Sequence, residues 1–219
     1  MSTPTVRYPE ILERLPPDST LILHGISWEE YESLLEAVGE SAGTRISYDR
    51  GRLQIMTLSS EHENYAKLIE RLVDLLSLRR RIKVLYFGSM TMKTKSEGKG
   101  SEPDACFYVQ SAASIGGKKQ LDFSKDPPPD IVVEVDLHHE SLSKFPIYAA
   151  LNVPEIWRYD GQALTIYHLR QDQYIQADSS LALPLLTSST LTEFLSRSWH
   201  EDQYETLLAF ERWLEAHPR

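Results

Sequence analysis

The sequence is short of cysteine, of positive charge and of long apolar runs. Its 219 residues include one cysteine, Cys106, which excludes an intrachain disulfide and a cysteine-based zinc site and fits a reducing cytoplasm. No run of about 18 apolar residues exists, so we expect no membrane span. Residues 1–20 lack a basic region followed by an apolar core, so we expect no secretory signal and a cytoplasmic protein.

The shortage of positive charge bears on what the protein binds. There are 23 Lys and Arg against 32 Asp and Glu, a net charge of −9, whereas proteins that grip nucleic acid without specificity are usually basic. An enzyme with a local basic groove is still compatible with this charge. Two basic stretches, at residues 79–83 and 93–99, could line such a groove, but we interpret them as a solvated helix end and a loop.

The order of predicted elements indicates a mixed α/β (α+β) fold, a central mixed sheet flanked by helices. We expect one domain over residues 1–219, with 1–20 as an extended arm and 198–219 as a C-terminal helix. Apolar spacing predicts further helices over 27–40, 59–81 and 141–152, the last capped near Ser141 or Ser143. Alternating or β-branched runs predict a hairpin over 44–58 and strands over 82–94, 104–110, 130–137, 154–160, 163–170 and 174–180. We expect a bend at Gly88 within the first of these strands, and loops over 95–103 and 111–129.

Two acids stand in a strand that otherwise looks buried. In the segment "PPPDIVVEVDLHHESLSKFPIYAALNVPEIWRYDG", Glu134 and Asp136 are two residues apart, so their side chains point to the same face of the strand. Asp104 begins an earlier strand, directly after Pro103. If these strands are neighbours, the carboxylates converge and repel one another unless positive charge lies between them.

A hard divalent cation, Mg²⁺ or Mn²⁺, is the usual answer to converging carboxylates. Lys144 opens the next predicted helix and could reach the same place. Carboxylates, metal and lysine together suit phosphodiester hydrolysis by a metal-activated water. The bland alternative is that Pro103-Asp104 forms a turn or cap and that Glu134 simply pairs with Lys144 or an arginine.

Three segments together resemble a known family. "SEPDACFYV", "PPPDIVVEVD" and "LSKFPIYAALNVPEIWRYDG", in this order and spacing, are similar to the Uma-two family of endonucleases, within the PD-(D/E)XK restriction-endonuclease-like superfamily. The similarity spans roughly residues 20 to 197, including "GRLQIMTLSSEHENYAKLIERLVDLL". The resemblance implies a metal-dependent endonuclease, a hydrolase that acts on nucleic acid, with DNA as the expected substrate.

The resemblance also implies roles for individual residues. Asp104 matches the aspartate of the first acidic element, Glu134 the acid of the second, and Lys144 a lysine displaced into the following helix. The backbone carbonyl of Val135 would be a metal ligand by the superfamily's habit. Glu63, or less favourably Glu61, would supply a further acid.

Two places depart from the family pattern or leave alternatives open. Asp136 stands where the superfamily's lysine usually lies; it is either a third metal ligand or a partner that quenches Lys144. The stretch from Leu137 to Ser141 replaces the family's usual "Ser-Pro-Ser". Its adjacent residues His138 and His139 make a poor chelating pair, so we interpret them as solvent-facing or as loop contacts. His62 matches a family histidine, but the residue by itself reads as a capping or surface group.

Three functions compete at this level. The first is a Mg²⁺- or Mn²⁺-dependent endonuclease that uses Asp104, Glu134, Lys144 and Glu63, with metal held by Asp104, Glu134, Asp136 and Val135. The second is a catalytically silent nucleic-acid-binding or regulatory protein on the same fold, suggested by the acidic charge and the altered motif. A two-carboxylate glycosidase has little support, because no aromatic-lined sugar cleft is indicated. A homodimer is a further hypothesis.

Overall fold

Two sheets flanked by helices make up the part of the chain that the computed structural model describes, residues 12, 14–39, 43–88, 90–118, 120–137 and 144–218. In these residues the first sheet has the strand order β1-β3-β2-β6-β5 and the second β11-β10-β9-β8-β7-β4. The paired strands of the first sheet are antiparallel, whereas the second is mixed because β8 and β9 run parallel. The mixed α/β fold class is therefore confirmed, with a second sheet where we expected one central sheet.

The first sheet, called sheet A below, consists of β1 (Thr20–His24), β2 (Thr44–Asp49), β3 (Arg52–Thr57), β5 (Met92–Thr94) and β6 (Lys99–Ser101). The second, sheet B, consists of β4 (Leu85–Tyr86), β7 (Ala105–Tyr108), β8 (Ile131–Val135), β9 (Glu155–Tyr159), β10 (Leu164–Arg170) and β11 (Gln173–Ala177). The helices are α2 (Trp28–Val38), α3 (Ser60–Arg80), α4 (Ala112–Ile115), α5 (Phe145–Ala150), α6 (Ser188–Arg197) and α7 (Gln203–Ala216).

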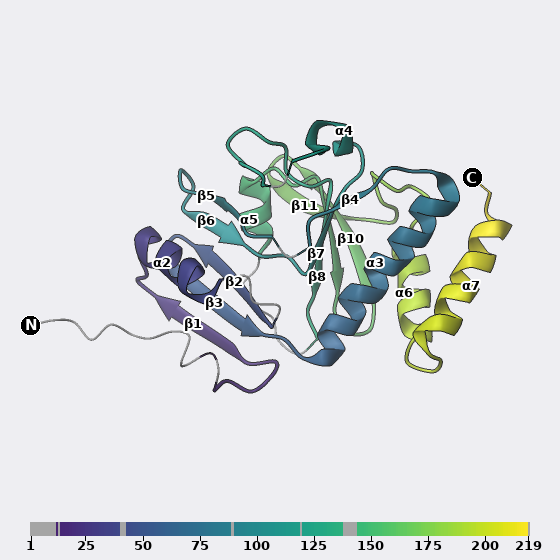
Figure 1. Ribbon diagram of the computed structural model, residues 1–219, viewed down its shortest axis with the longest axis horizontal. Helices are drawn as coiled ribbons and strands as arrows, with labels where there is room; N and C mark the ends of the chain where they lie inside the picture. Colours follow the sequence, from purple (N-terminus) through teal and green to yellow (C-terminus); the bar gives the residue numbers. More distant parts are fainter. Residues whose placement is uncertain are drawn as a thin grey trace, which may run out of the picture.

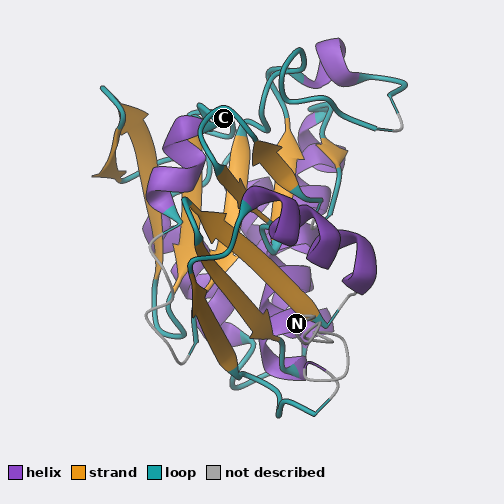
Figure 2. Ribbon diagram, turned by 90° about the vertical axis from the view of Figure 1, so that its left-hand side faces the viewer, coloured by secondary structure: helices purple, strands orange, loops and turns teal. Residues whose placement is uncertain are grey.

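The helices are distributed over the outer faces of the two sheets. Figure 1 shows α2 on sheet A at one end of the molecule and α3, α6 and α7 beside sheet B at the other end. Viewed from the side of α2, the strands lie between helices in front of them and helices behind them (Figure 2). Helix α5 contacts β6 of sheet A and β11 of sheet B, so it bridges the sheets.

Local sequence signals explain the best-predicted elements. The side chain of Ser27 accepts the backbone N–H of Glu30, and the carboxylate of Glu30 accepts the backbone N–H of Ser27, so the predicted capping box is present. Between β2 and β3, Arg50 and Gly51 both have positive φ, 48° and 92°, as a two-residue type I′ hairpin turn requires. The predicted helix and hairpin are both confirmed.

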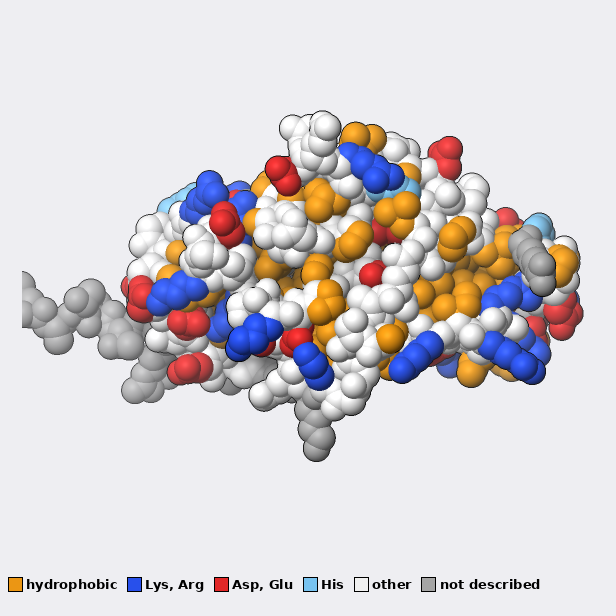
Figure 3. All heavy atoms as spheres, turned by 90° about the horizontal axis from the view of Figure 1, so that it is seen from above, with side chains coloured by type: hydrophobic (Ala, Val, Ile, Leu, Met, Phe, Trp, Pro, Cys, Tyr) orange, Lys and Arg blue, Asp and Glu red, His pale blue; other side chains and the backbone are white. Residues whose placement is uncertain are grey.

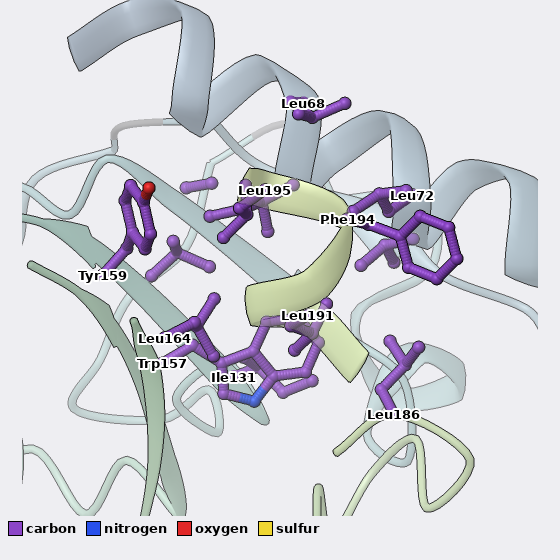
Figure 4. Packing of buried hydrophobic residues seen from close by; sticks show 14 of the residues in the cluster. Leu68, Leu72, Ile131, Trp157, Tyr159, Leu164, Leu186, Leu191, Phe194 and Leu195 are labelled. Carbon is purple, nitrogen blue, oxygen red and sulfur yellow. The ribbon is translucent and has the colours of Figure 1, made fainter. Parts of the chain in front are cut away.

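The apolar alternation of β8 fixes how the helices pack on sheet B. Val133 and Val135 belong to the core cluster that includes side chains of α3, α6 and α7, and Figure 4 shows this packing around Trp157. Val132, on the other face, packs with Ile147 of α5. A strand buried on both faces offers no solvated side for a charge, so an acid within it needs partners from the protein.

Several boundaries differ from those predicted. The segment 82–94 divides into β4 and β5, which lie in different sheets, because the chain turns at Gly88 with φ of 58°. Strand β6 lies in the segment predicted as a loop, and α4 in the polar loop over 111–129. The C-terminal helix begins at Gln203 rather than at 198, because Asp202 caps it.

Some predictions fall on residues outside the described ranges, and others concern the burial of Cys106 and the absence of a membrane span. Most of the predicted arm, the predicted caps Ser141 and Ser143, and the pair His138 and His139 lie outside the described residues. Cys106 is buried, as we expect of a structural cysteine rather than a nucleophile, and burial raises the pKa of its thiol to about 12. Among the described helices, none is both long and apolar enough to cross a bilayer.

Glu155, at the start of β9, offers a test of buried charge remote from the acids discussed below. It is fully buried and accepts hydrogen bonds from the indole of Trp157 and, at 2.7 Å, from the backbone of Leu181. Burial raises its pKa above the ordinary 4.5, although these hydrogen bonds oppose the shift. A raised carboxyl pKa contributes stability below the unfolded-state pKa that is lost as pH rises through the folded-state pKa.

Glu155→Gln is expected to remove this pH dependence while lowering the free energy of unfolding by about 1–3 kcal/mol, because one acceptor is replaced by a donor facing donors. Urea unfolding at a series of pH values checks both effects. The raised pKa of Glu155 would be contradicted if, above the ordinary carboxyl pKa, the native protein became more stable relative to Glu155→Gln as the pH rises.

Candidate functional site

Asp104 and Glu134 face each other across two neighbouring strands. Strands β7 and β8 are antiparallel, with Ala105 opposite Val133, and the next position in this register sets Asp104 opposite Glu134. The expectation that the two strands are neighbours is thus confirmed. Both acids are buried, with exposed fractions of 5% and 3%. Two carboxylates so placed must be neutralised by the protein itself or by a ligand.

Asp104 is held by donors from three different elements. Its Oδ2 accepts the backbone N–H of Val135 at 2.8 Å, and its Oδ1 accepts the Nε–H of Arg45, from β2, at 3.1 Å. The Nε2 of His62, from the first turn of α3, lies 3.2 Å from Oδ2. Burial alone would raise the pKa of Asp104, but His62, Lys144 and Arg45 outweigh it and hold the pKa below its ordinary value. Asp104 is therefore the acid that stays ionised.

Glu134 is held from one helix face. The Nζ of Lys144, at the position that precedes α5, lies 2.5 Å from Oε2, and the hydroxyl of Tyr148 donates to Oε1. Burial raises the pKa of Glu134 to about 7; Lys144 opposes the rise, whereas Asp104 and Asp136 add to it. Burial alone would lower the pKa of Lys144, but Glu134 and Asp104 raise it above its ordinary value, so Lys144 carries its charge.

His62 occupies a place that the residue by itself did not indicate. Its backbone is part of a helix cap, because Ser59 accepts its N–H, but its side chain is 3% exposed and lies against Asp104. The interpretation as a surface group was wrong. Its Nδ1 is buried and has no hydrogen-bond partner in the described part of the structure. Asp104 raises the pKa of His62 despite its burial, which would lower it.

The other predicted residues lie around this pair. Asp136 pairs with Arg158 of β9, with 2.7 Å between its Oδ2 and the arginine Nε. Glu63 is linked to Asp104 through Arg45, whose Nη2 lies 3.3 Å from Glu63 Oε1. Glu61 is exposed. The roles predicted for these residues stay predictions, as do those of Asp104, Glu134, Lys144 and Val135.

Two residues that hold the acids were missed, Arg45 and Tyr148. Tyr148 follows Lys144 by four residues on α5, a spacing that places both side chains on one helix face, and this signal was available in the sequence. Arg45 belongs to the hairpin of sheet A, and no local pattern indicates that β2 lies beside Asp104. The pairing of β2 with β6, which precedes Asp104 by a few residues, brings it there.

Comparison with known proteins identifies the family. A family model described as "Uma2: Putative restriction endonuclease" matches residues 28–210. The chain belongs to the Uma2 family. This confirms the resemblance carried by the motifs around Asp104, Glu134 and Lys144.

One solved structure supports the fold of this Uma2 chain. A protein from Anabaena variabilis ATCC 29413, described as "a putative nuclease belonging to DUF820", has a TM-score of 0.50 and 15% sequence identity, and the match covers 78% of this chain and 99% of that one. Comparison with curated proteins gives no match. Family membership and the shared fold together support a nuclease.

The donor atoms of this Uma2 site suit a hard divalent cation, because carboxylate and carbonyl oxygens are its preferred ligands. In the described residues, however, no group of three or more His, Cys, Asp or Glu side chains is already arranged to hold a metal ion. The oxygens of Asp104 and Glu134 instead contact Arg45, His62, Lys144 and Tyr148. An ion at this place would share the neutralisation that these groups now provide.

Several side chains of the basic stretches of this Uma2 chain pair with acids. Lys93 and Lys95 pair with Glu32 and Glu29 of α2, and Arg79 pairs with Glu211 of α7. On the face seen from above, basic side chains form separate groups, several beside acidic ones (Figure 3). Arg79 is half exposed, in agreement with the predicted solvated helix end. The stretch 93–99 is not simply the predicted loop, because Lys93 lies in β5 and Lys99, in β6, is buried.

Asp104→Ala is expected to lower the free energy of unfolding by about 3–5 kcal/mol, because it leaves the buried guanidinium of Arg45 without this carboxylate. Asp104→Asn is expected to cost less, because the amide oxygen can still accept the N–H of Val135. Urea unfolding of the two variants measures the difference. Equal losses would show that the amide oxygen does not replace the carboxylate as acceptor, and no loss in either variant would contradict the pairing of Asp104 with Arg45.

Proposed function

We propose that this protein is a Mg²⁺- or Mn²⁺-dependent nuclease that hydrolyses phosphodiester bonds of DNA. The observation that carries the proposal is the facing pair of buried carboxylates, Asp104 and Glu134, with Lys144 at 2.5 Å from Glu134. The pair lies where β8 ends, and ligands of α/β sheets commonly bind outside the carboxyl ends of strands. Membership of the Uma2 family gives this geometry its functional context.

Asp104, Glu134 and the carbonyl of Val135 would hold the ion. When bound, a divalent cation polarises a phosphoryl oxygen and lowers the pKa of a coordinated water. Arg45 and the backbone of Val135 orient Asp104 from two sides. Lys144 places a positive charge beside Glu134, where it can stabilise the negative charge that develops on a phosphoryl group. Asp136, with Arg158 as its partner, is a more distant candidate ligand.

A catalytically silent nucleic-acid-binding protein is the second candidate, and a specific observation favours it. Both acids already have cationic partners from the chain, Arg45 for Asp104 and Lys144 for Glu134, so the site is electrically satisfied without a ligand. A protein that had lost its reaction could keep such a network for its fold alone. Measurements of cleavage and of metal binding separate the two candidates.

Cleavage of supercoiled and single-stranded DNA with Mg²⁺, Mn²⁺ or EDTA tests the nuclease. Glu134→Gln and Asp104→Asn are expected to lower metal-dependent cleavage by about 100-fold or more, since even groups that only support metal ligands cost 10–100-fold. Glu155→Gln is a matched control, because it replaces a buried acid of the neighbouring strand at the opposite end of the register. It should retain cleavage at temperatures where it is folded.

Calorimetric titration with Mn²⁺ completes the comparison. Binding by the native chain that Glu134→Gln weakens supports the enzyme. Native protein that neither binds Mn²⁺ nor cuts DNA, while Glu134→Gln behaves identically, would reject the nuclease in favour of the silent protein.

A further inference from the structure

Lys144, which precedes α5, and Tyr148, within it, contact the two carboxylate oxygens of Glu134. Tyr148 has no role assigned so far. Lys144 contacts Oε2, and the hydroxyl of Tyr148 donates to Oε1. The lysine supplies the charge that the carboxylate requires. The tyrosine adds no charge, so its hydroxyl serves another purpose than neutralisation.

The hydroxyl of Tyr148 is one member of a chain of buried hydrogen bonds. The Oγ of Ser101, from β6, lies 3.2 Å from the tyrosine oxygen, and the Oγ of Ser47, from β2, lies 3.0 Å from that of Ser101. These three side chains are at most 2% exposed. The Ser47–Ser101–Tyr148 chain thus links sheet A to the carboxylate of Glu134 in sheet B, in a place where water does not compete for the bonds.

The direction of the chain follows from the number of protons. The phenol of Tyr148 has one proton, and it donates this proton to Oε1 of Glu134. Because that proton is donated to Glu134, the bond between Ser101 and Tyr148 must be donated by the serine. Ser47 then donates to Ser101. Each hydroxyl along the chain points toward Glu134, which fixes the rotation of its carboxylate.

The helix that carries Tyr148 is itself anchored to sheet A. The Nζ of Lys99, from β6, donates to the carbonyl of Pro146 in the first turn of α5 at 2.7 Å, and Lys99 is only 7% exposed. This bond fixes the position of α5 on the sheet, and with it the position of Tyr148 two residues later. The tyrosine oxygen is therefore located by two independent contacts with sheet A.

We propose that Tyr148 is a positioning residue, which orients Glu134 toward Asp104 through the Ser47–Ser101–Tyr148 chain so that the carboxylate can bind a divalent ion. This inference rests on the proposed metal-dependent function. It assigns to sheet A a part in the site that its sequence did not indicate. A carboxylate held by Lys144 alone would be neutralised but free to rotate about its last bond.

Tyr148→Phe tests the proposal, because it removes one oxygen and keeps the ring in the core. Mn²⁺ titration is expected to show 10–100-fold weaker binding, the range for groups that support metal ligands, and kcat for DNA cleavage should fall while KM changes little. Ser101→Ala, which removes the donor to Tyr148 but leaves Tyr148 on Glu134, should shift Mn²⁺ binding in the same direction by less.

Tyr108→Phe is the matched control. Tyr108 is equally buried, and its hydroxyl donates to the carbonyl of Pro127 rather than to an acid. This variant should bind Mn²⁺ like the native chain. Unaltered Mn²⁺ affinity and kcat in folded Tyr148→Phe would overturn the proposal.

Crystal structures of the native chain and Tyr148→Phe, both without metal, separate this inference from the function on which it rests. A rotated carboxylate of Glu134 in the variant supports positioning, and an unmoved one overturns it, whether or not the protein binds metal. Failure of the native chain to bind Mn²⁺ or to cut DNA would instead reject the proposed function, and with it the metal-binding purpose of the positioning.

Discussion

The candidate site is built around the antiparallel register of β7 and β8. This register sets two acids, Asp104 and Glu134, opposite each other in the interior, where each ionised carboxylate costs several kcal/mol unless it is paired. The chain meets this cost unequally. His62, Lys144 and Arg45 hold the pKa of Asp104 below its ordinary value, whereas burial raises the pKa of Glu134. Two carboxylates with separated pKa values are the arrangement from which acid and base roles commonly arise.

Sheet A supplies side chains that hold the acids of this site. Arg45 and Ser47 are two residues apart on β2, so they share one face of the strand; Arg45 reaches Asp104, and Ser47 begins the chain that ends on Glu134. Glu102, in the connection from β6 to β7, accepts the backbone N–H of Ile46 at 3.0 Å and so ties β2 to the start of β7. Two residues on one face of β2 are therefore linked to the two acids, Arg45 directly to Asp104 and Ser47 through Ser101 and Tyr148 to Glu134.

Much of the site could be predicted because its central residues follow one another locally. Asp104 begins a strand, Glu134 stands among β-branched residues, and Lys144 opens the next helix, so spacing alone indicated them. The contacts of Arg45 and His62 could not be predicted, because they depend on how β2 and α3 meet sheet B across long stretches of chain. The same reason explains β6: its three residues, Lys99 to Ser101, carry no β-branched pattern and become a strand by pairing with β2 and β5.

The fold was predictable to a similar depth. Helix caps and the hairpin turn at Gly51 are read from a few neighbouring residues, and those elements agree with the structure. The division into two sheets is not local. The predicted bend at Gly88 is present, but no local pattern indicates that β4 before it and β5 after it enter different sheets.

The residues that contact one another in the site lie far apart in the sequence, which bears on when the site forms during folding. Arg45 lies 59 residues before Asp104, and Ser101 lies 47 residues before Tyr148. Contacts between such distant residues form late, because the loops that join them must be closed first. Asp104 precedes Glu134, Lys144 and Tyr148 in the sequence, so it is made before them. A chain made only as far as Asp104 therefore has no acid pair, and the site is complete only when both sheets have docked.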